Sequence, residues 1–102
     1  MVQNVLFLAV FNSAHRVMKA EHVLKQDGLA ILLIPAPRAL STDCGLAIRY
    51  DGELFDRVLH ILQSENLLPA AIYRKKNELL YEIVWDTDTK EPNDLLSPSV
   101  SS

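Results

Sequence analysis

The sequence predicts an α+β domain of the ferredoxin-like type, a split βαβ sandwich in βαββαβ order with a mostly antiparallel sheet and both helices on one face. Two observations lead to this class. Short apolar runs of strand length alternate with two segments of helical periodicity. The chain has 102 residues, 49% apolar and 23% charged, which is ordinary for one globular domain. We expect a single domain over residues 1–85, including a possible extra C-terminal strand, and a disordered tail over residues 86–102.

The first half of the chain supplies a strand, a helix and a second strand. Residues 5–11 are a continuous apolar run, which is typical of a strand covered on both faces. Asn12 and Ser13 offer an N-cap to a helix over residues 14–28, in which apolar residues recur at helical spacing and a glycine suits the end. Residues 29–34, "LAILLI", are a second apolar strand, which the following two prolines end.

The second half repeats this order and adds a strand. Residues 46–50 are a short third strand, and residues 53–66 form a helix with one broad apolar face. A fourth strand over residues 69–73 is followed by the loop "RKKN" at 74–77. This loop predicts a hairpin into residues 78–85, where apolar and polar side chains alternate.

The predicted topology leads to three further expectations. The first and third strands lie side by side in the centre of the sheet. The first two strands are apolar on both sides, so the face without helices needs a cover, and we expect either a homodimer or a lid formed by the last strand. We also expect both helices to begin at the end of the sheet that lies opposite the loop between the second and third strands.

Composition excludes several classes of function. The net charge is −3 and the only basic cluster is Arg74-Lys75-Lys76, which is no footprint for nucleic acid. The apolar run at 5–11 lacks a positive flank and is far shorter than the roughly 20 residues that cross a bilayer, so we expect no signal peptide and no membrane span. Three glycines cannot build a phosphate loop, and the three histidines have no metal-ligand spacing, so we expect no metal and no cofactor. One cysteine cannot form an internal disulfide, which favours a reducing cytoplasm.

That one cysteine, Cys44, lies in the polar stretch "PAPRALSTDCGLAIR", residues 35–49. A structural cysteine normally lies in the core, where it behaves as a small hydrophobe. Here Ser41 or Thr42 can cap a turn whose backbone N–H groups surround an anion. Gly45 can take a positive φ and lets a partner approach the sulfur closely. The loop therefore has the parts of an anion-binding nest around a reactive thiol.

Charged side chains near this loop are the second part of the predicted site. Arg38 precedes the cysteine by six residues and Arg49 follows it by five. A reactive thiolate needs positive charge nearby, and Arg38 is the best-placed candidate, while Asp43 acts in the opposite direction. Glu21 lies inside the apolar stripe of the first helix. It either reaches solvent at the edge of the stripe or forms a half-buried partner for one of the two arginines.

Three motifs carry a resemblance to a known family. They are "F-x-S" at 11–13, "A-E-x-x-L-K" at 20–25 and, most specifically, "I-P-x-P-R-x-L-S-x-D-C-G-x-A-I-R" at 34–49. With them the chain resembles the selenium/sulfur carrier protein-like family, small bacterial domains that also occur fused behind a TusA-like domain. The resemblance covers roughly residues 5 to 75. Family patterns more often show isoleucine and paired serines where this chain has Leu-Ser-Thr at 40–42.

The resemblance implies that Cys44 carries sulfur or selenium as a persulfide or selenopersulfide. It also implies that Arg38 and Arg49 are flanking cations, that Ser41 and Gly45 form the loop, and that the partners are donor and acceptor proteins. It does not distinguish sulfur from selenium.

Two other classes of function stay open at this point. A non-catalytic binding module would use the loop between Arg38 and Arg49 to hold a small anion or a partner's carboxylate, with Cys44 a bystander. A thiol enzyme would need a resolving cysteine and a general acid, and neither is evident in the sequence. Whether the protein is an enzyme is therefore left undecided.

Overall fold

The computed structural model of the protein describes residues 5–40 and 44–87. These residues form five strands, two α-helices and one short 3₁₀ turn. In chain order they are β1 (Leu6–Val10), α1 (Ala14–Gln26), β2 (Ile31–Pro35), β3 (Leu46–Asp51), η1 (Gly52–Leu54), α2 (Phe55–Ser64), β4 (Ala71–Lys75) and β5 (Tyr81–Asp86). The predicted α+β class and the order of elements are confirmed, although β4 and β5 begin later than predicted. Asp86 belongs to β5, and residues 88–102 of the expected tail lie outside the described residues.

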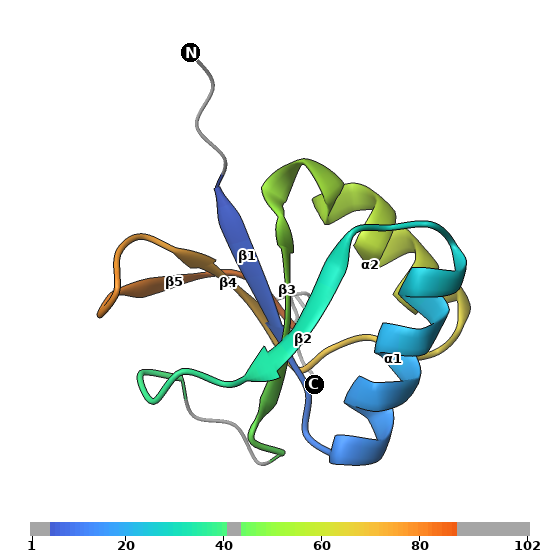
Figure 1. Cartoon of the computed structure of the whole chain (residues 1–102), viewed down its shortest axis with the longest axis horizontal. Helices are drawn as coiled ribbons and strands as arrows, with labels where there is room; N and C mark the ends of the chain where they lie inside the picture. Colours follow the sequence, from blue (N-terminus) through green and yellow to red (C-terminus); the bar gives the residue numbers. More distant parts are fainter. Residues whose placement is uncertain (1–4, 41–43, 88–102) are drawn as a thin grey trace, which may run out of the picture.

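The five strands form one antiparallel sheet in the order β2-β3-β1-β4-β5. β1 and β3 are central neighbours, as predicted. Both helices lie on the same face of this sheet (Figure 1). β5 pairs with β4 and extends the sheet sideways, so it does not fold over the face without helices. The expectation that the last strand forms a lid is therefore wrong.

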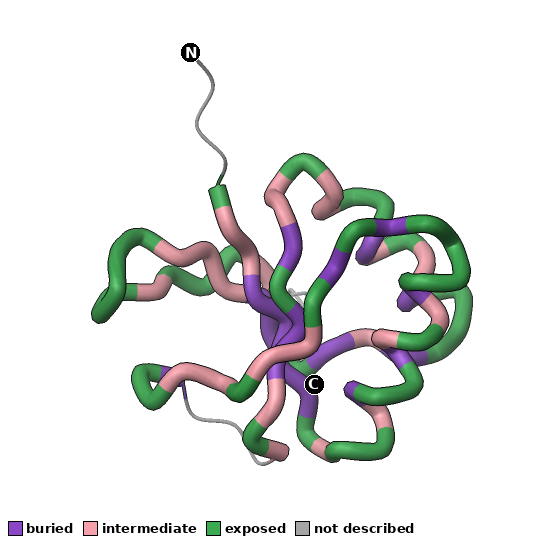
Figure 2. Tube along the Cα trace, in the orientation of Figure 1, coloured by how far each residue is buried: buried purple, intermediate pink, exposed green. Residues whose placement is uncertain are grey.

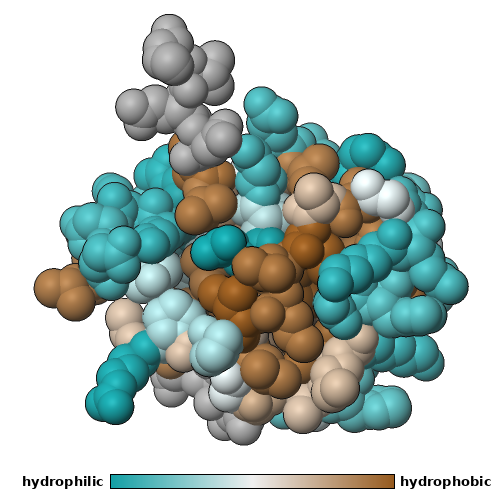
Figure 3. All heavy atoms as spheres, in the orientation of Figure 1, coloured by the Kyte–Doolittle hydropathy of each residue, from teal (hydrophilic) through white to brown (hydrophobic). Residues whose placement is uncertain are grey.

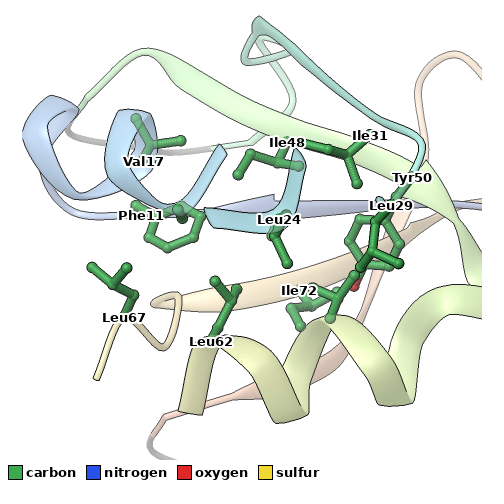
Figure 4. Close-up of a cluster of buried hydrophobic side chains, with 13 residues drawn as sticks. Phe11, Val17, Leu24, Leu29, Ile31, Ile48, Tyr50, Leu62, Leu67 and Ile72 are labelled. Atoms are coloured by element: carbon green, nitrogen blue, oxygen red, sulfur yellow. The ribbon is translucent and has the colours of Figure 1, made fainter. Parts of the chain in front are cut away.

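The helices and the sheet enclose the larger of two apolar clusters. Ser13 caps α1 with its hydroxyl, which accepts the Arg16 N–H at 3.2 Å. The buried residues of α1 follow at helical spacing, and α2 adds Val58 and Leu62. Figure 4 shows these side chains meeting Ile48, Ile72 and other residues of the strands. The cluster lies on what we call the helix side of the sheet.

The opposite face, which we call the open face, is closed in its middle by a loop. Side chains alternate along β3, so Ile48 packs with the helix-side cluster while its neighbour Ala47 belongs to a second, smaller cluster. The second cluster consists of Leu8, Val10, Leu40, Ala47 and Ala71. Of these, Leu40 comes from the loop between β2 and β3 and is only 7% exposed. Figure 2 shows the buried residues concentrated in the middle of the molecule, where the strands overlap in this view.

The β2–β3 loop and the N-terminus of α1 lie at the same end of the sheet, which the sequence did not predict. Val10, the last residue of β1, pairs with Ala47, and Pro35, the last residue of β2, pairs with Leu46 at the start of β3. Because α1 begins at Ala14, directly after β1, its N-terminus lies at the same end as the β2–β3 loop. The expectation that both helices begin at the opposite end is wrong. β1 and β3 are antiparallel and finish at opposite ends, so only α2 begins away from the loop.

Candidate functional site

Cys44 lies immediately before β3, at the end of the sheet where the β2–β3 loop returns. Its Sγ donates to the carbonyl oxygen of Leu46 at 3.3 Å and accepts the backbone N–H of the same residue at 3.4 Å. The side chain is partly buried and packs against the helix-side cluster. Cys44 is therefore neither sealed in the core nor fully exposed.

Gly45 provides open space next to that sulfur. Its φ of +74° lies in the left-handed region that favours glycine, which confirms the positive φ expected from the sequence. Among the described residues, a Cβ placed on Gly45 would meet no other atom within 4 Å. The carbonyl oxygen of Gly45 accepts the N–H of Ala36 at 2.9 Å, and this bond ties the two ends of the loop together. The backbone beside Cys44 is thus anchored on one side and open on the other.

The two arginines do not share one position around the thiol. Arg38 is exposed in a turn that the bond from the Leu40 N–H to the Pro37 carbonyl closes at 3.0 Å. Arg49 is also exposed, but the alternation along β3 places it on the open face, whereas Cys44 packs on the helix side. Neither guanidinium forms a hydrogen bond or an ion pair with another described residue. Only Arg38 therefore stays a candidate for a cation beside Cys44.

The remaining predicted site residues are placed as follows. Ser41 and Thr42 lie outside the described residues, so the anion nest expected from them stays a prediction. Glu21 forms an ion pair with Lys25, one helical turn further along α1, with 2.9 Å between Oε2 and Nζ. Its described partner is therefore neither arginine, and the interpretation of Glu21 as a carboxylate at the edge of the stripe is the better one.

A hollow that sequence reasoning did not predict lies at the same end of the sheet. This cavity of about 350 Å³ is lined by Asn12, Arg16, Leu68, Pro69, Ala70 and Thr87. The guanidinium of Arg16 donates to the carbonyl oxygens of Leu68 at 3.2 Å and Asn66 at 3.5 Å, which holds this cation at the hollow. Its lining comes from three separate stretches of chain, so no local motif marks it. A polar group of a partner has room to enter here.

Other kinds of site are missing from the described part of the chain. Within residues 5–40 and 44–87, no three histidine, cysteine or acidic side chains are close enough together to hold a metal ion. In the same residues, no helix has the length and apolar character that a bilayer span requires.

Comparison with known proteins gives one match. Residues 6–74, more than half of the 102-residue chain, match the family described as "Putative Se/S carrier protein-like". The matched part runs from the start of β1 into β4 and contains the loop with Cys44. No curated protein and no solved structure matches the chain.

Proposed function

Since the chain belongs to the Se/S carrier protein-like family, we propose that it carries sulfane sulfur or selenium on Cys44, as a persulfide or selenopersulfide. The observation that supports this most is the position of Cys44, a partly buried residue at the end of the sheet that is followed by Gly45, which is exposed and has a positive φ. A carrier needs a thiol that two different partners can reach in turn. A cysteine buried among aliphatic side chains would not meet that need.

The transfer we propose is an exchange in two steps. The Cys44 thiolate attacks the terminal sulfur of a donor persulfide, the donor's S–S bond breaks, and the donor leaves as a thiolate. An acceptor thiolate then attacks the terminal sulfur on Cys44 and releases the Cys44 thiolate. Sulfur changes hands without net oxidation or reduction. Selenium follows the same course, with selenium as the terminal atom.

Each neighbouring group has a proposed part in this exchange. The N–H of Leu46, 3.4 Å from Sγ, is a donor that a sulfur anion can accept. Gly45 leaves room for the approaching partner. Arg38, exposed and without an ion-pair partner among the described residues, attracts the anionic donor or acceptor group to the loop.

The proposal also covers partners and location. The partners are one protein that donates the chalcogen and one that accepts it, with no role for nucleic acid. Because the lone cysteine must stay a free thiol between transfers, we place the protein in a reducing cytoplasm. We further propose that the chain forms a homodimer.

The test is loading of the purified protein by a cysteine desulfurase supplied with cysteine, measured by intact mass. We expect one added sulfur atom per chain, lost on treatment with a thiol reductant and absent from Cys44→Ala. No added mass on the wild type would end the proposal.

Two glycine variants form a matched pair that isolates access to the sulfur. Gly45 and Gly28 have φ of +74° and +83°, and each has open space where a Cβ would lie. Gly45→Leu and Gly28→Leu should therefore lose similar stability, roughly 1–2 kcal/mol each. Only Gly45→Leu should slow loading, since only it places a side chain beside Cys44. Equal loading rates in the two variants would show that the space at Gly45 is not the route to the sulfur.

A second candidate function is favoured by one observation. Arg38 and Arg49 are both exposed and have no ion-pair partner among the described residues, which suits a module that binds anions without using the thiol. Such a module would show anion-dependent thermal stabilisation that survives Cys44→Ser and is lost in Arg38→Ala or Arg49→Ala. The carrier requires no such stabilisation.

A further inference from the structure

The two edge strands of the sheet differ in their protection against pairing with another chain. β5 holds Glu82 as its second residue, paired with Arg74 on β4, and its pairing with β4 is interrupted by a register shift. Charged side chains, proline and irregular pairing are features with which proteins block sheet edges. β2 has no charged side chain and pairs with β3 in one unbroken register, and its one proline, Pro35, is its last residue. β2 is therefore the less protected of the two edges.

The side chains of β2 are apolar on both faces of the sheet. Leu32 lies on the open face and is 46% exposed, and Ile34 on the same face is half-buried. Leu33, which packs on the helix side, is half-buried as well. Figure 3 shows apolar surface gathered in the middle of the view, where Figure 1 places β2. Apolar surface of this kind at an edge marks an interaction site.

We propose that β2 pairs antiparallel with β2 of a second copy of the chain, so that two sheets join edge to edge. Charge favours a second copy as the occupant. An identical β2 brings no charged group that pairing would desolvate, and antiparallel pairing of two like strands is self-complementary about a two-fold axis. The inference rests on the homodimer proposed above and specifies its interface, and it does not depend on the carrier chemistry.

Packing the two open faces against each other is the less favourable dimer. Arg49 lies on that face between its register partners Leu8 and Leu32, and it has no ion pair with a described residue. Stacking would bury its guanidinium against an apolar surface, at a large desolvation cost. Leu40 already covers the middle of the face. Edge pairing leaves Arg49 in solvent and still buries Leu32.

The proposed geometry keeps the two thiols apart. The loop with Cys44 follows Pro35, the last residue of β2. In an antiparallel pair, the Pro35 ends of the two β2 strands point in opposite directions. The two Cys44 loops thus lie at opposite ends of the joined sheet, and each stays open to a partner.

The test measures the dimer dissociation constant by sedimentation over a dilution series, on the full chain. Leu32→Lys places an ammonium in the proposed interface and should raise this constant roughly tenfold or more. The matched control is Ile83→Lys on the other edge strand, where the side chain is similarly exposed, at 51%. This control should leave the constant unchanged. Circular dichroism establishes that both variants are folded.

A second measurement needs no variant. Hydrogen exchange of the wild type, compared at high and low protein concentration, should show backbone N–H groups of β2 that become protected only at high concentration, and none in β5. A monomer at all concentrations would overturn the proposal, as would Ile83→Lys weakening the dimer as much as Leu32→Lys. Sulfur loading of Leu32→Lys should match the wild type, so failure of the dimer and failure of the carrier are seen separately.

Discussion

The two faces of this sheet are closed by different means. The helix side is covered by α1 and α2, whose apolar residues repeat at helical spacing. The open face has no helix; Leu40 from the β2–β3 loop is buried at its middle, and Ala36 and Tyr81 pack against the same cluster. Four positions later the same loop reaches Cys44, which packs on the helix side. Leu40 and Cys44 therefore pack on opposite faces of the sheet, and the segment that carries the thiol also contributes to a core.

Removing a large side chain from the helix side should have the largest effect on stability. Leu62 on α2 is fully buried in the helix-side cluster. Leu62→Ala leaves a cavity and should lower the free energy of unfolding by about 2–5 kcal/mol. Chemical denaturation measures this loss. The rate at which a thiol reagent modifies Cys44 under native conditions should change little, because the loop keeps its anchor at Leu40.

Truncating Leu40 on the open face should cost less stability than Leu62→Ala but should increase the reactivity of Cys44 more. Leu40→Ala lowers the free energy of unfolding by about 2 kcal/mol, at the lower end of the range, since a loop can settle partly into the space. It also frees one end of the segment that leads to Cys44. We expect faster modification of Cys44 than in Leu62→Ala. An equal rate in the two variants would show that Leu40 does not position the thiol.

A buried hydroxyl on the helix side gives a stabilising variant. Tyr50 is 2% exposed, and its hydroxyl has no hydrogen-bond partner among the described residues. Tyr50→Phe removes an unsatisfied polar group and should raise the free energy of unfolding by about 1 kcal/mol. A loss of stability in urea denaturation would mean that the hydroxyl has a partner.

The same residue predicts a dependence on pH. Burial raises the pKa of Tyr50 well above its ordinary value of about 10. The folded state then holds its proton more tightly than the unfolded state. The contribution of Tyr50 to the free energy of unfolding is fully present below a pH of about 10 and is lost as the pH rises above that value. Tyr50→Phe should lack this part of the alkaline loss, so its advantage over the wild type grows above that pH.

The smallest effect is expected at the solvent edge of the helix side. Glu21→Gln removes the ion pair with Lys25, in which Lys25 is exposed and Glu21 is half-buried. Such pairs contribute little, so the free energy of unfolding should change by less than about 0.5 kcal/mol. A loss several times larger, measured by the same denaturation, would point to a partner for Glu21 beyond Lys25.

The sequence was a good guide to the helix side and a poor one to the open face. Periodicity identifies α1 and α2, and alternation and apolar runs identify the strands, because these patterns arise within one element. Leu40 shows no such pattern. It is one apolar residue in a polar loop, and its burial depends on how the loop crosses strands that are distant in sequence. For the same reason, the sequence alone predicts an uncovered open face that needs a dimer partner or the last strand to close it.

The candidate site was predictable in its centre but not in its surroundings. One cysteine followed by glycine in a polar loop is a local signal, and Cys44 and Gly45 lie together as expected. Arg49 is close in sequence, but the alternation along a strand sends its side chain to the other face. Arg16 enters the same end of the sheet from α1, and its position depends on the antiparallel pairing of β1 with β3.

The most direct test of the central claim follows sulfur into and out of Cys44. The protein is loaded by a desulfurase from cysteine labelled with radioactive sulfur, separated from the donor, and then mixed with an unlabelled acceptor thiol. The account predicts one labelled sulfur per chain, full release to the acceptor, and no label on Cys44→Ala. Label that enters Cys44→Ala equally well, or that stays on the wild type after the acceptor is added, would contradict it.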